Sequence, residues 1–447
     1  MPSRRKFLHD TLLAGTGLAL LQQEALAKLA KAVAALPTNR SPEQVATDED
    51  FWTTVQQAFA VDRSLINLNN GGVSPAPRVV MDALKQYLDY SNLAPAYTMW
   101  RHLEPRIETV REGLAEMFGC SPEEVAITRN ASESLQTLQF GLELRRGDEV
   151  ITTVQDYPRM ITTWQQRVRR DGIVLKKVRY PVPLINPKDF VRAIEEAITP
   201  KTRVIHVSHI VVYTGQILPV AEICQIGKAR GIEVIVDGAH SFAHLPFKHA
   251  DLGCDYFGAS LHKWLYAPIG TGLLYVRKEK IKNVWSLFAA PESMQNDIRK
   301  FEEIGTHPAA NHNAIAEALG FNENLGIARK AARLRYLQRL WIERLRKFEN
   351  VRFRINIDDE SQWCGLVNVH IEGTDPSKVQ SYLFEKHRIY TVAILPLPDS
   401  PPIKTPFSDD FTGIRITPNV YTRPSEIERF ADAMEKIAKG VVKEVKA

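Results

Sequence analysis

Ser260-Leu261-His262-Lys263-Trp264 directly follows a short apolar run, and Val236-Asp237-Gly238-Ala239-His240 closes another one upstream, with Asp237 standing 26 residues before Lys263. Short apolar runs bounded by polar residues are typical of buried strands. We therefore expect both polar clusters at the ends of strands in one sheet. Ligands of open α/β sheets bind beyond the carboxyl ends of the strands, so this edge of the sheet is the predicted site.

The residue types in the two clusters match the chemical needs of pyridoxal 5'-phosphate (PLP). PLP enzymes use a lysine that forms a Schiff base, an acid that keeps the pyridine nitrogen protonated, and a cradle for the phosphate. A lysine preceded by Ser-x-His, downstream of Asp-x-x-His, resembles the PLP site of the class V aminotransferase family. The resemblance implies that Lys263 carries the cofactor, that Asp237 pairs with its ring nitrogen and that His240 contacts its phenolic oxygen. The plainer alternatives are a solvated lysine after a strand and an aspartate that forms a turn.

Asn130-Ala131-Ser132-Glu133 ends a predicted strand and begins a predicted helix. Free N–H groups and the helix dipole make a helix N-terminus a phosphate site. Ala131 and Ser132 resemble the family's phosphate contacts, which Ser260 and His262 complete. The alternative is a simple N-terminal cap of the helix.

Three further positions resemble family residues that contact the partner subunit or the substrate. Thr306, in a Gly-Thr turn, matches a residue that reaches the phosphate from the partner, which implies a homodimer with a shared active site. Arg415 lies on a predicted strand and resembles the arginine that clamps the substrate carboxylate through two parallel hydrogen bonds; otherwise it is an arginine on a solvated strand face. We expect Asn70, after an early strand, to line the substrate entrance.

Ring-bearing residues follow two other predicted strands. The resemblance implies that Tyr157 stacks on the face of the cofactor, although a tyrosine here could also be a core or rim residue. His206 and His209 are three residues apart on an extended segment, so their rings should point to opposite faces. We therefore predict no metal site there, and we expect His209 to lie in the pocket near the cofactor.

The order of predicted elements indicates an α/β protein of PLP fold type I. Strand-like and helical runs alternate between residues 125 and 277, which favours a mostly parallel, doubly wound sheet of seven strands. The expected strands are 125–128, 149–154, 173–178, 203–208, 233–237, 256–259 and 272–277. We predict a linker and N-terminal helix over 28–61, a large PLP-binding domain over 62–310, and a smaller C-terminal α+β domain over 311–447.

The N-terminus predicts export. Ser3-Arg4-Arg5-Lys6-Phe7-Leu8 resembles the twin-arginine consensus, and an apolar run and a small-x-small cleavage site at Ala25-Leu26-Ala27 follow. The apolar run is too short for a transmembrane helix. Residues 1–27 are therefore predicted to be a signal peptide that directs the protein to the periplasm through the twin-arginine export machinery, without stable membrane association. The alternative is a basic cytosolic N-terminus before an amphipathic helix.

Composition narrows the possible functions. A formal net charge of +5 without a concentrated basic run gives no indication of nucleic-acid binding. The four cysteines show no C-x-x-C spacing, and residues 391–412 contain none. Since cysteine desulfurases carry a nucleophilic cysteine on a loop shortly before the carboxylate-binding arginine, desulfurase activity is disfavoured.

The predicted function is that of an exported, PLP-dependent, aminotransferase-like enzyme that acts on an amino acid or a peptide-borne amino group. His209-Ile210-x-x-x-Thr214-Gly215, with Leu218-Pro219-Val220, places the chain nearest to the isopenicillin-N-epimerase-like subgroup. A PLP-dependent epimerase or lyase is the alternative reaction. A binding protein that retains the fold without catalysis is a third possibility, which the presence of Lys263, Asp237 and Arg415 together disfavours.

Overall fold

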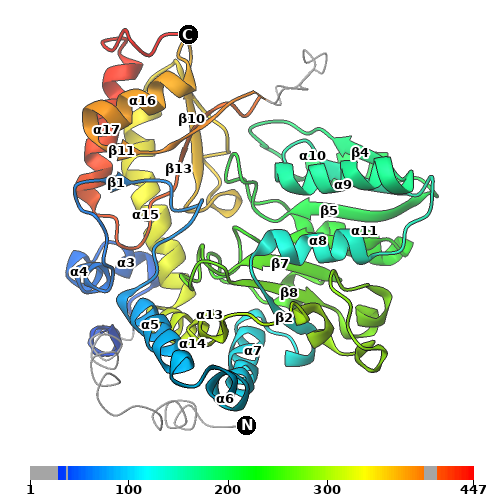
Figure 1. Ribbon diagram of the computed structural model, residues 1–447. Coiled ribbons are helices and arrows are strands. Elements are labelled where there is room, and N and C mark those ends of the chain that lie inside the picture. The colour runs from blue at the N-terminus through cyan, green and yellow to red at the C-terminus, as the bar shows by residue number, and fades with distance from the viewer. Residues whose placement is uncertain (1–28, 37–38, 397–409) are drawn as a thin grey trace.

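The computed structural model describes residues 29–36, 39–396 and 410–447. The chain forms a large and a small domain that lie side by side (Figure 1). No helix in this described part is both long and apolar enough to span a membrane. The predicted signal peptide, residues 1–27, lies outside the described residues.

A seven-stranded sheet forms the centre of the large domain, in the order β2-β8-β7-β6-β5-β3-β4. Only β8 runs antiparallel to its neighbours. The predicted mostly parallel sheet is therefore confirmed, with every strand end within one residue of the expected one. The strands are β2 Val125–Thr128, β3 Glu149–Thr153, β4 Val174–Val178, β5 Thr202–Ser208, β6 Glu233–Asp237, β7 Tyr256–Ser260 and β8 Gly272–Val276.

Helices cover both faces of this sheet, which explains why its strands read as nearly continuous apolar runs. α8 (Ala131–Gly141) and α9 (Pro158–Asp171) pack on one face, against side chains such as Val150, Ile235 and Leu274. α7 (Glu104–Phe118), α10 (Pro187–Ala197) and α11 (Val220–Arg230) contribute to the larger core on the other face, with Ile205, Val236 and Phe257. The alternation of side chains along each strand therefore decides to which face a residue near the site points.

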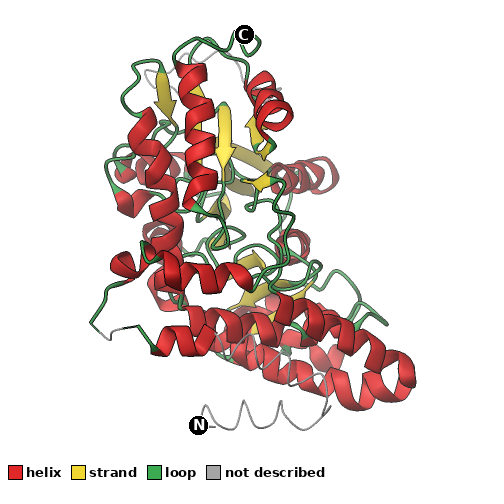
Figure 2. Cartoon of the chain, turned by 90° about the vertical axis from the view of Figure 1, so that its left-hand side faces the viewer, coloured by secondary structure: helices red, strands yellow, loops and turns green. Residues whose placement is uncertain are grey.

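The small domain is built on the antiparallel sheet β12-β13-β10-β9. Its core joins Val369, Ile414 and Ile416 of the sheet to Trp341 and Phe430 of two helices. Figure 2 shows helices on either side of these strands in the upper part of the view. The elements are β9 Val351–Phe353, β10 Val367–Ile371, β12 Val392–Ile394, β13 Gly413–Ile416, α15 Ile327–Leu345, α16 Pro376–His387 and α17 Pro424–Ala438.

At both predicted domain boundaries, one segment packs in the other domain than the sequence predicts. β1 (Ile66–Asn67), predicted in the large domain, pairs in parallel with β11 (Ile389–Tyr390), and Ile66 and Leu68 belong to the small-domain core. In the opposite sense, α13 (Ala309–Asn313) and α14 (Ile315–Leu325) pack with α5 (Arg78–Leu93) and α7 in the large-domain core. Both corrections arise from contacts between segments far apart in the sequence.

Candidate active site

The two polar clusters meet at the carboxyl edge of the large sheet. β6 and β7 are parallel neighbours, and Asp237 pairs in register with Gly258. The chain after β7 then brings Lys263 Nζ to 3.1 Å from His240 Nε2. The structure thus places Lys263, His240 and Asp237 in one group, as the sequence predicts.

Burial favours the uncharged forms of these three side chains and shifts their pKa values accordingly. Desolvation lowers the pKa of Lys263 to about 8, because it opposes the charged ammonium more strongly than the nearby Asp237 carboxylate favours it. Desolvation also raises the pKa of Asp237 to about 6, although the Ala239 N–H donates to its Oδ1 at 2.9 Å and opposes the rise. The buried His240 has a pKa held well below its usual value by desolvation and by the neighbouring Lys263, so its imidazole is neutral. A lysine with a lowered pKa is a better nucleophile at neutral pH than an ordinary one.

The predicted phosphate residues lie around the N-terminus of α8. Asn130 caps this helix by accepting the Glu133 N–H at 2.9 Å, and the Ala131 N–H donates to Ser260 Oγ at 3.0 Å. Ser132 occupies the next helical position and is half-buried. His262 has its Nδ1 3.3 Å from the Thr271 carbonyl oxygen, which engages that nitrogen with the backbone. The four predicted phosphate residues therefore come from two chain segments that are in direct contact.

Arg415 lies on β13 of the small domain and is 7% exposed. Its Nη1 donates to the Val212 carbonyl at 3.0 Å and its Nη2 donates to Asn69 Oδ1 at 2.9 Å, whereas its buried Nε has no partner among the described residues. A guanidinium has five N–H donors, so three remain for a ligand. No carboxylate of the described residues forms an ion pair with Arg415, and burial lowers its pKa to about 10. A buried guanidinium with unused donors and no ion-pair partner fits a site for a substrate carboxylate.

The loop over residues 209–217 holds Arg415 in place. Gly215 has a φ of +84°, and a Cβ there would lie 1.8 Å from the Leu366 carbonyl oxygen, so only glycine allows this close approach of the two domains. This approach lets the Val212 carbonyl accept from Arg415. The sequence motif around Gly215 thus contributes to the geometry of the carboxylate site.

Asn69, rather than Asn70, faces the substrate region. Asn70 is fully buried, and its side chain bonds to the carbonyls of Asn67 and Thr417 and to the Tyr421 hydroxyl. The prediction that Asn70 lines the entrance is therefore wrong: its amide joins the chain after β1 to the small domain. Asn69 holds Arg415, and the sequence carried no signal to choose between two adjacent asparagines in a turn.

Tyr157 lies at the start of α9, next to the buried Asp156. The Asp156 carboxylate accepts from the N–H and hydroxyl of Ser208 and from the N–H of Thr153, all within 2.8 Å, and so fixes the end of β3 against β5. Tyr157 itself is half-buried and close enough to Arg415 to oppose the lowering of the arginine's pKa. Its stacking on the cofactor stays a prediction.

His209 points away from the cofactor site. Ser208 is in register with Asp237, so the next residue on β5's path faces the opposite side of the sheet. The His209 ring packs edge-on against Phe247 at 5.1 Å, whereas the His206 ring lies on the other face, where Trp164 Nε1 donates to its Nδ1 at 3.1 Å. The expected contact between His209 and the cofactor is therefore wrong in this arrangement. Among the described residues, no cluster of three or more histidine, cysteine or acidic side chains could hold a metal ion.

Nothing in the sequence pattern singles out His244, yet it joins the site to the small domain. Its Nε2 accepts the Gly365 N–H at 3.0 Å, which makes its Nδ1 the donor to the His240 carbonyl at 2.8 Å. The ring also stacks on Trp264, the residue after Lys263, at 3.7 Å. His244 therefore positions the backbone of His240 and the side chain that follows Lys263.

His244→Phe is expected to keep the stack on Trp264 and to leave the His240 carbonyl and the Gly365 N–H unpaired. Each unpaired buried group costs roughly 1–3 kcal/mol, so the melting temperature should fall. Looser placement of His240 should also weaken PLP binding by roughly tenfold, measured by fluorescence titration of the apo-protein. The loss of affinity should vanish in a His240→Ala background; an equal loss there would show that His244 does not act through His240.

Thr306 is exposed on the surface of the single chain, in a turn where Gly305 has a φ of +75°. Thr306 lies shortly before α13 in the chain, beside the exposed Gly305. Among the described residues, no hydrogen bond joins Thr306 to Lys263. This placement leaves it free for a contact from outside the chain.

Comparison with known proteins decides the family. The sequence pattern of the family described as "Aminotransferase class-V" matches residues 66–393, most of the chain. The chain belongs to the class-V aminotransferase family. It is 28% identical over 404 residues to the isopenicillin N epimerase of Streptomyces clavuligerus, a match that covers 86% of this chain and 98% of that protein. It is 30% identical over 313 residues to a probable cysteine desulfurase of Synechocystis, covering 66% of this chain and 71% of that protein.

Solved structures confirm the fold class. A C-DES mutant with glycine covalently linked to its PLP cofactor aligns with a TM-score of 0.73 at 23% identity, covering 84% of this chain and 98% of that one. The apo cysteine desulfurase of Thermococcus onnurineus NA1 aligns with the same TM-score at 22% identity, covering 91% and 100%. This member of the family is a PLP-dependent enzyme of fold type I.

The residues present fit PLP. Among the described residues, neither the buried His240 Nδ1 nor the buried Arg415 Nε has a hydrogen-bond partner. Unpartnered polar atoms of this kind fit a site that is completed by a ligand. Lys263 would bond the cofactor, Asp237 would pair with its ring nitrogen, and the start of α8 with Ser260 would hold its phosphate. All three requirements of PLP binding are met within one edge of the sheet.

Proposed function

We propose that the enzyme is exported and acts on the amino group of an α-amino acid, free or borne by a peptide, in an aminotransferase-like reaction. The observation that carries this proposal is the Arg415 guanidinium, which has no ion-pair partner among the described residues and lies close enough to Lys263 to lower the pKa of that lysine. A lysine for the amino group and an arginine for the carboxylate together match the two ends of an amino acid. Epimerisation is the second candidate, since the match to the Streptomyces clavuligerus isopenicillin N epimerase spans nearly that whole protein.

The side chains divide the work at the substrate's α-carbon. PLP, when bound, supplies an electron sink for the amine joined to it. Arg415 orients the carboxylate and thereby fixes which bond of the α-carbon faces the cofactor ring. Lys263, with a pKa near neutrality, is the group placed to take a proton from the α-carbon and return it. Asp237 would hold a proton on the ring nitrogen of the bound cofactor, and neutral His240 keeps the Lys263 amine within hydrogen-bond reach.

The cysteines support a reaction other than persulfide-forming desulfuration. All four are free thiols, and three of them are buried. Desolvation raises the pKa of Cys120, Cys224 and Cys364 to about 12, and it raises the pKa of Cys254 well above its usual value. A thiolate is the nucleophile in such chemistry, and these environments disfavour it.

A panel of L- and D-amino acids and short peptides in D2O tests the reaction class. Formation of a keto product together with pyridoxamine phosphate supports transamination. Deuterium at the α-carbon with both enantiomers present would show that the reaction is epimerisation instead. Release of the substrate's side chain would show that it is a lyase reaction. Failure of every carboxylate-bearing amine to react would overturn the proposal.

The proposed enzyme works as a homodimer in which Thr306 completes the partner's phosphate site. A chain with Lys263→Ala and a chain with Thr306→Glu should each be inactive alone. After equal co-expression, activity should return to about a quarter of the wild-type level, because half of the dimers are mixed and each mixed dimer has one intact site. No recovery in purified mixed dimers would contradict a contribution from the partner.

Export by the twin-arginine route is proposed from Arg4 and Arg5, which lie outside the described residues. Arg4→Lys combined with Arg5→Lys should retain the precursor in the cytoplasm, since the export machinery reads this pair. Cell fractionation with immunoblotting measures the distribution. Unchanged recovery from the periplasm would refute this route.

A further inference from the structure

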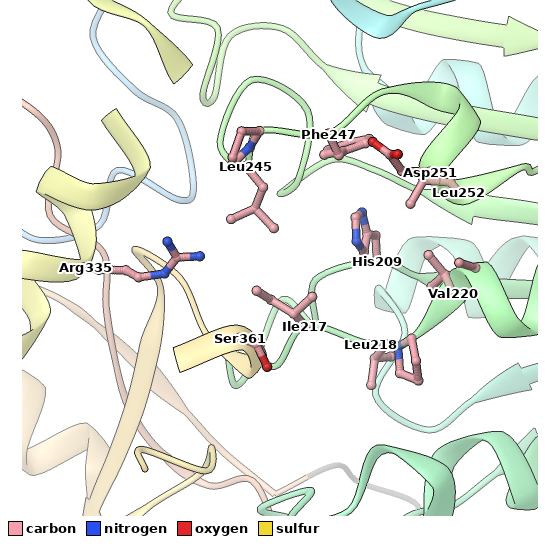
Figure 3. Close-up of a pocket in the computed structure, with 13 residues that line it drawn as sticks. His209, Ile217, Leu218, Val220, Leu245, Phe247, Asp251, Leu252, Arg335 and Ser361 are labelled. Atoms are coloured by element: carbon pink, nitrogen blue, oxygen red, sulfur yellow. The ribbon is translucent and has the colours of Figure 1, made fainter. Parts of the chain in front are cut away.

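A pocket of about 390 Å³ lies between the two domains, and neither Lys263 nor Arg415 lines it. The large domain supplies its floor through residues 217–221, 245–247 and 251–252, and the small domain closes it with Arg335 and Ser361. Figure 3 shows the Arg335 guanidinium and the His209 ring facing one another across the pocket, with Leu245 on one side and Ile217 on the other. Most of the lining is apolar, including Leu218, Val220, Leu245, Phe247 and Leu252.

His209 is a buried polar side chain that this lining leaves unsatisfied. It is 6% exposed, and its Nδ1 has no hydrogen-bond partner among the described residues. Burial lowers its pKa to about 4, so the ring is neutral and offers one donor and one acceptor. Buried polar groups are normally paired, so the imidazole of His209 at the wall of this pocket is a candidate partner for a polar ligand atom or a water.

Arg335 supplies a charge that no described residue neutralises by an ion pair. Its Nε donates to the Trp363 carbonyl at 3.2 Å, and its remaining donors stay available. The other polar groups of the pocket are already engaged: Asp251 accepts the Lys248 N–H, and the Ser361 hydroxyl donates to Asp359. The pocket therefore presents one cationic fork, one imidazole and the Asp251 carboxylate between apolar walls.

We propose that this pocket binds a small apolar carboxylate, with the carboxylate on Arg335, the apolar body between Leu218, Phe247 and Leu252, and His209 at its inner end. The guanidinium favours an anion, and the apolar walls favour an apolar body over a sugar. The pocket is distinct from the proposed substrate site. The two sites nevertheless share one loop, because His209 lines the pocket and Val212 accepts from Arg415.

Calorimetric titration of the holoenzyme with phenylacetate, indole-3-acetate and 4-methylpentanoate tests the proposal. The titrations use an Arg415→Gln background, so that the proposed substrate clamp cannot take the probe. At least one probe should bind once per chain, and neutral phenylacetamide should bind more weakly than phenylacetate. The result does not depend on which reaction the enzyme catalyses, because binding alone is measured.

Three variants in the same background locate the probe. Arg335→Gln should weaken carboxylate binding about tenfold or more, since a charge-assisted bond is lost, and should leave phenylacetamide nearly unchanged. Ala221→Trp should block both probes by filling the pocket. Arg339→Gln is the matched control, because it lies on the same helix, pairs with Glu360 and does not line the pocket. Absence of saturable binding, or equal effects of the Arg335 and Arg339 substitutions, would overturn the proposal.

Discussion

Arg415→Gln is expected to lower kcat/KM for amino acids by about two to four orders of magnitude. The substitution removes two hydrogen bonds to a charged carboxylate, worth roughly 1.5–3 kcal/mol each, and each 1.4 kcal/mol corresponds to a factor of ten. Matched primary amines without the carboxylate should lose less than about threefold, because they never form these bonds. PLP attachment should persist, since Arg415 belongs to the small domain and contacts Asn69 and Val212.

Arg354→Gln is the control for this experiment. Arg354 is another buried arginine of the small domain, and its partner is Asp410 at 2.6 Å. Its loss should reduce stability without changing the preference between amino acids and amines. Equal losses on both substrate classes in Arg415→Gln would show that Arg415 is structural and would remove the main support for an amino-acid substrate.

Lys263→Ala is expected to lower turnover by about four orders of magnitude or more, because it removes both the group that bonds the cofactor and the group placed to carry the α-proton. The protein should still fold, since among the described residues the Lys263 side chain forms a hydrogen bond only with His240. Residual turnover should rise with added methylamine, which fits the space left by the side chain. Rates within tenfold of wild type would contradict both roles.

The large domain was predictable because its strands are buried on both faces. Val125–Thr128 and Glu233–Asp237 read as apolar runs bounded by polar residues, and their predicted ends are the observed ones. The assignment of β1 was not predictable, because its partner β11 lies near the other end of the chain. Local sequence pattern indicates a strand but not the strand with which it pairs.

The site was predictable where residue type and spacing carry chemistry. Lys263, Asp237 and Arg415 are such positions, and the structure gathers them around one edge of the sheet. The face occupied by His209 depends on the register with β6, which places Ser208 opposite Asp237. His244 and Asn69 act through hydrogen bonds to His240 and Arg415 across the fold, and neither residue has a local signature.

The central claim is that Lys263 carries PLP, and borohydride reduction of the wild-type holoenzyme followed by peptide mapping tests it most directly. Lys330 is the informative competitor, because this fully buried lysine donates to the carbonyl of Trp264, next to Lys263, and burial lowers its pKa as well. We predict one reduced PLP adduct per chain, in the peptide that contains Lys263. An adduct on Lys330 or on any other lysine, with Lys263 unmodified, would contradict the account.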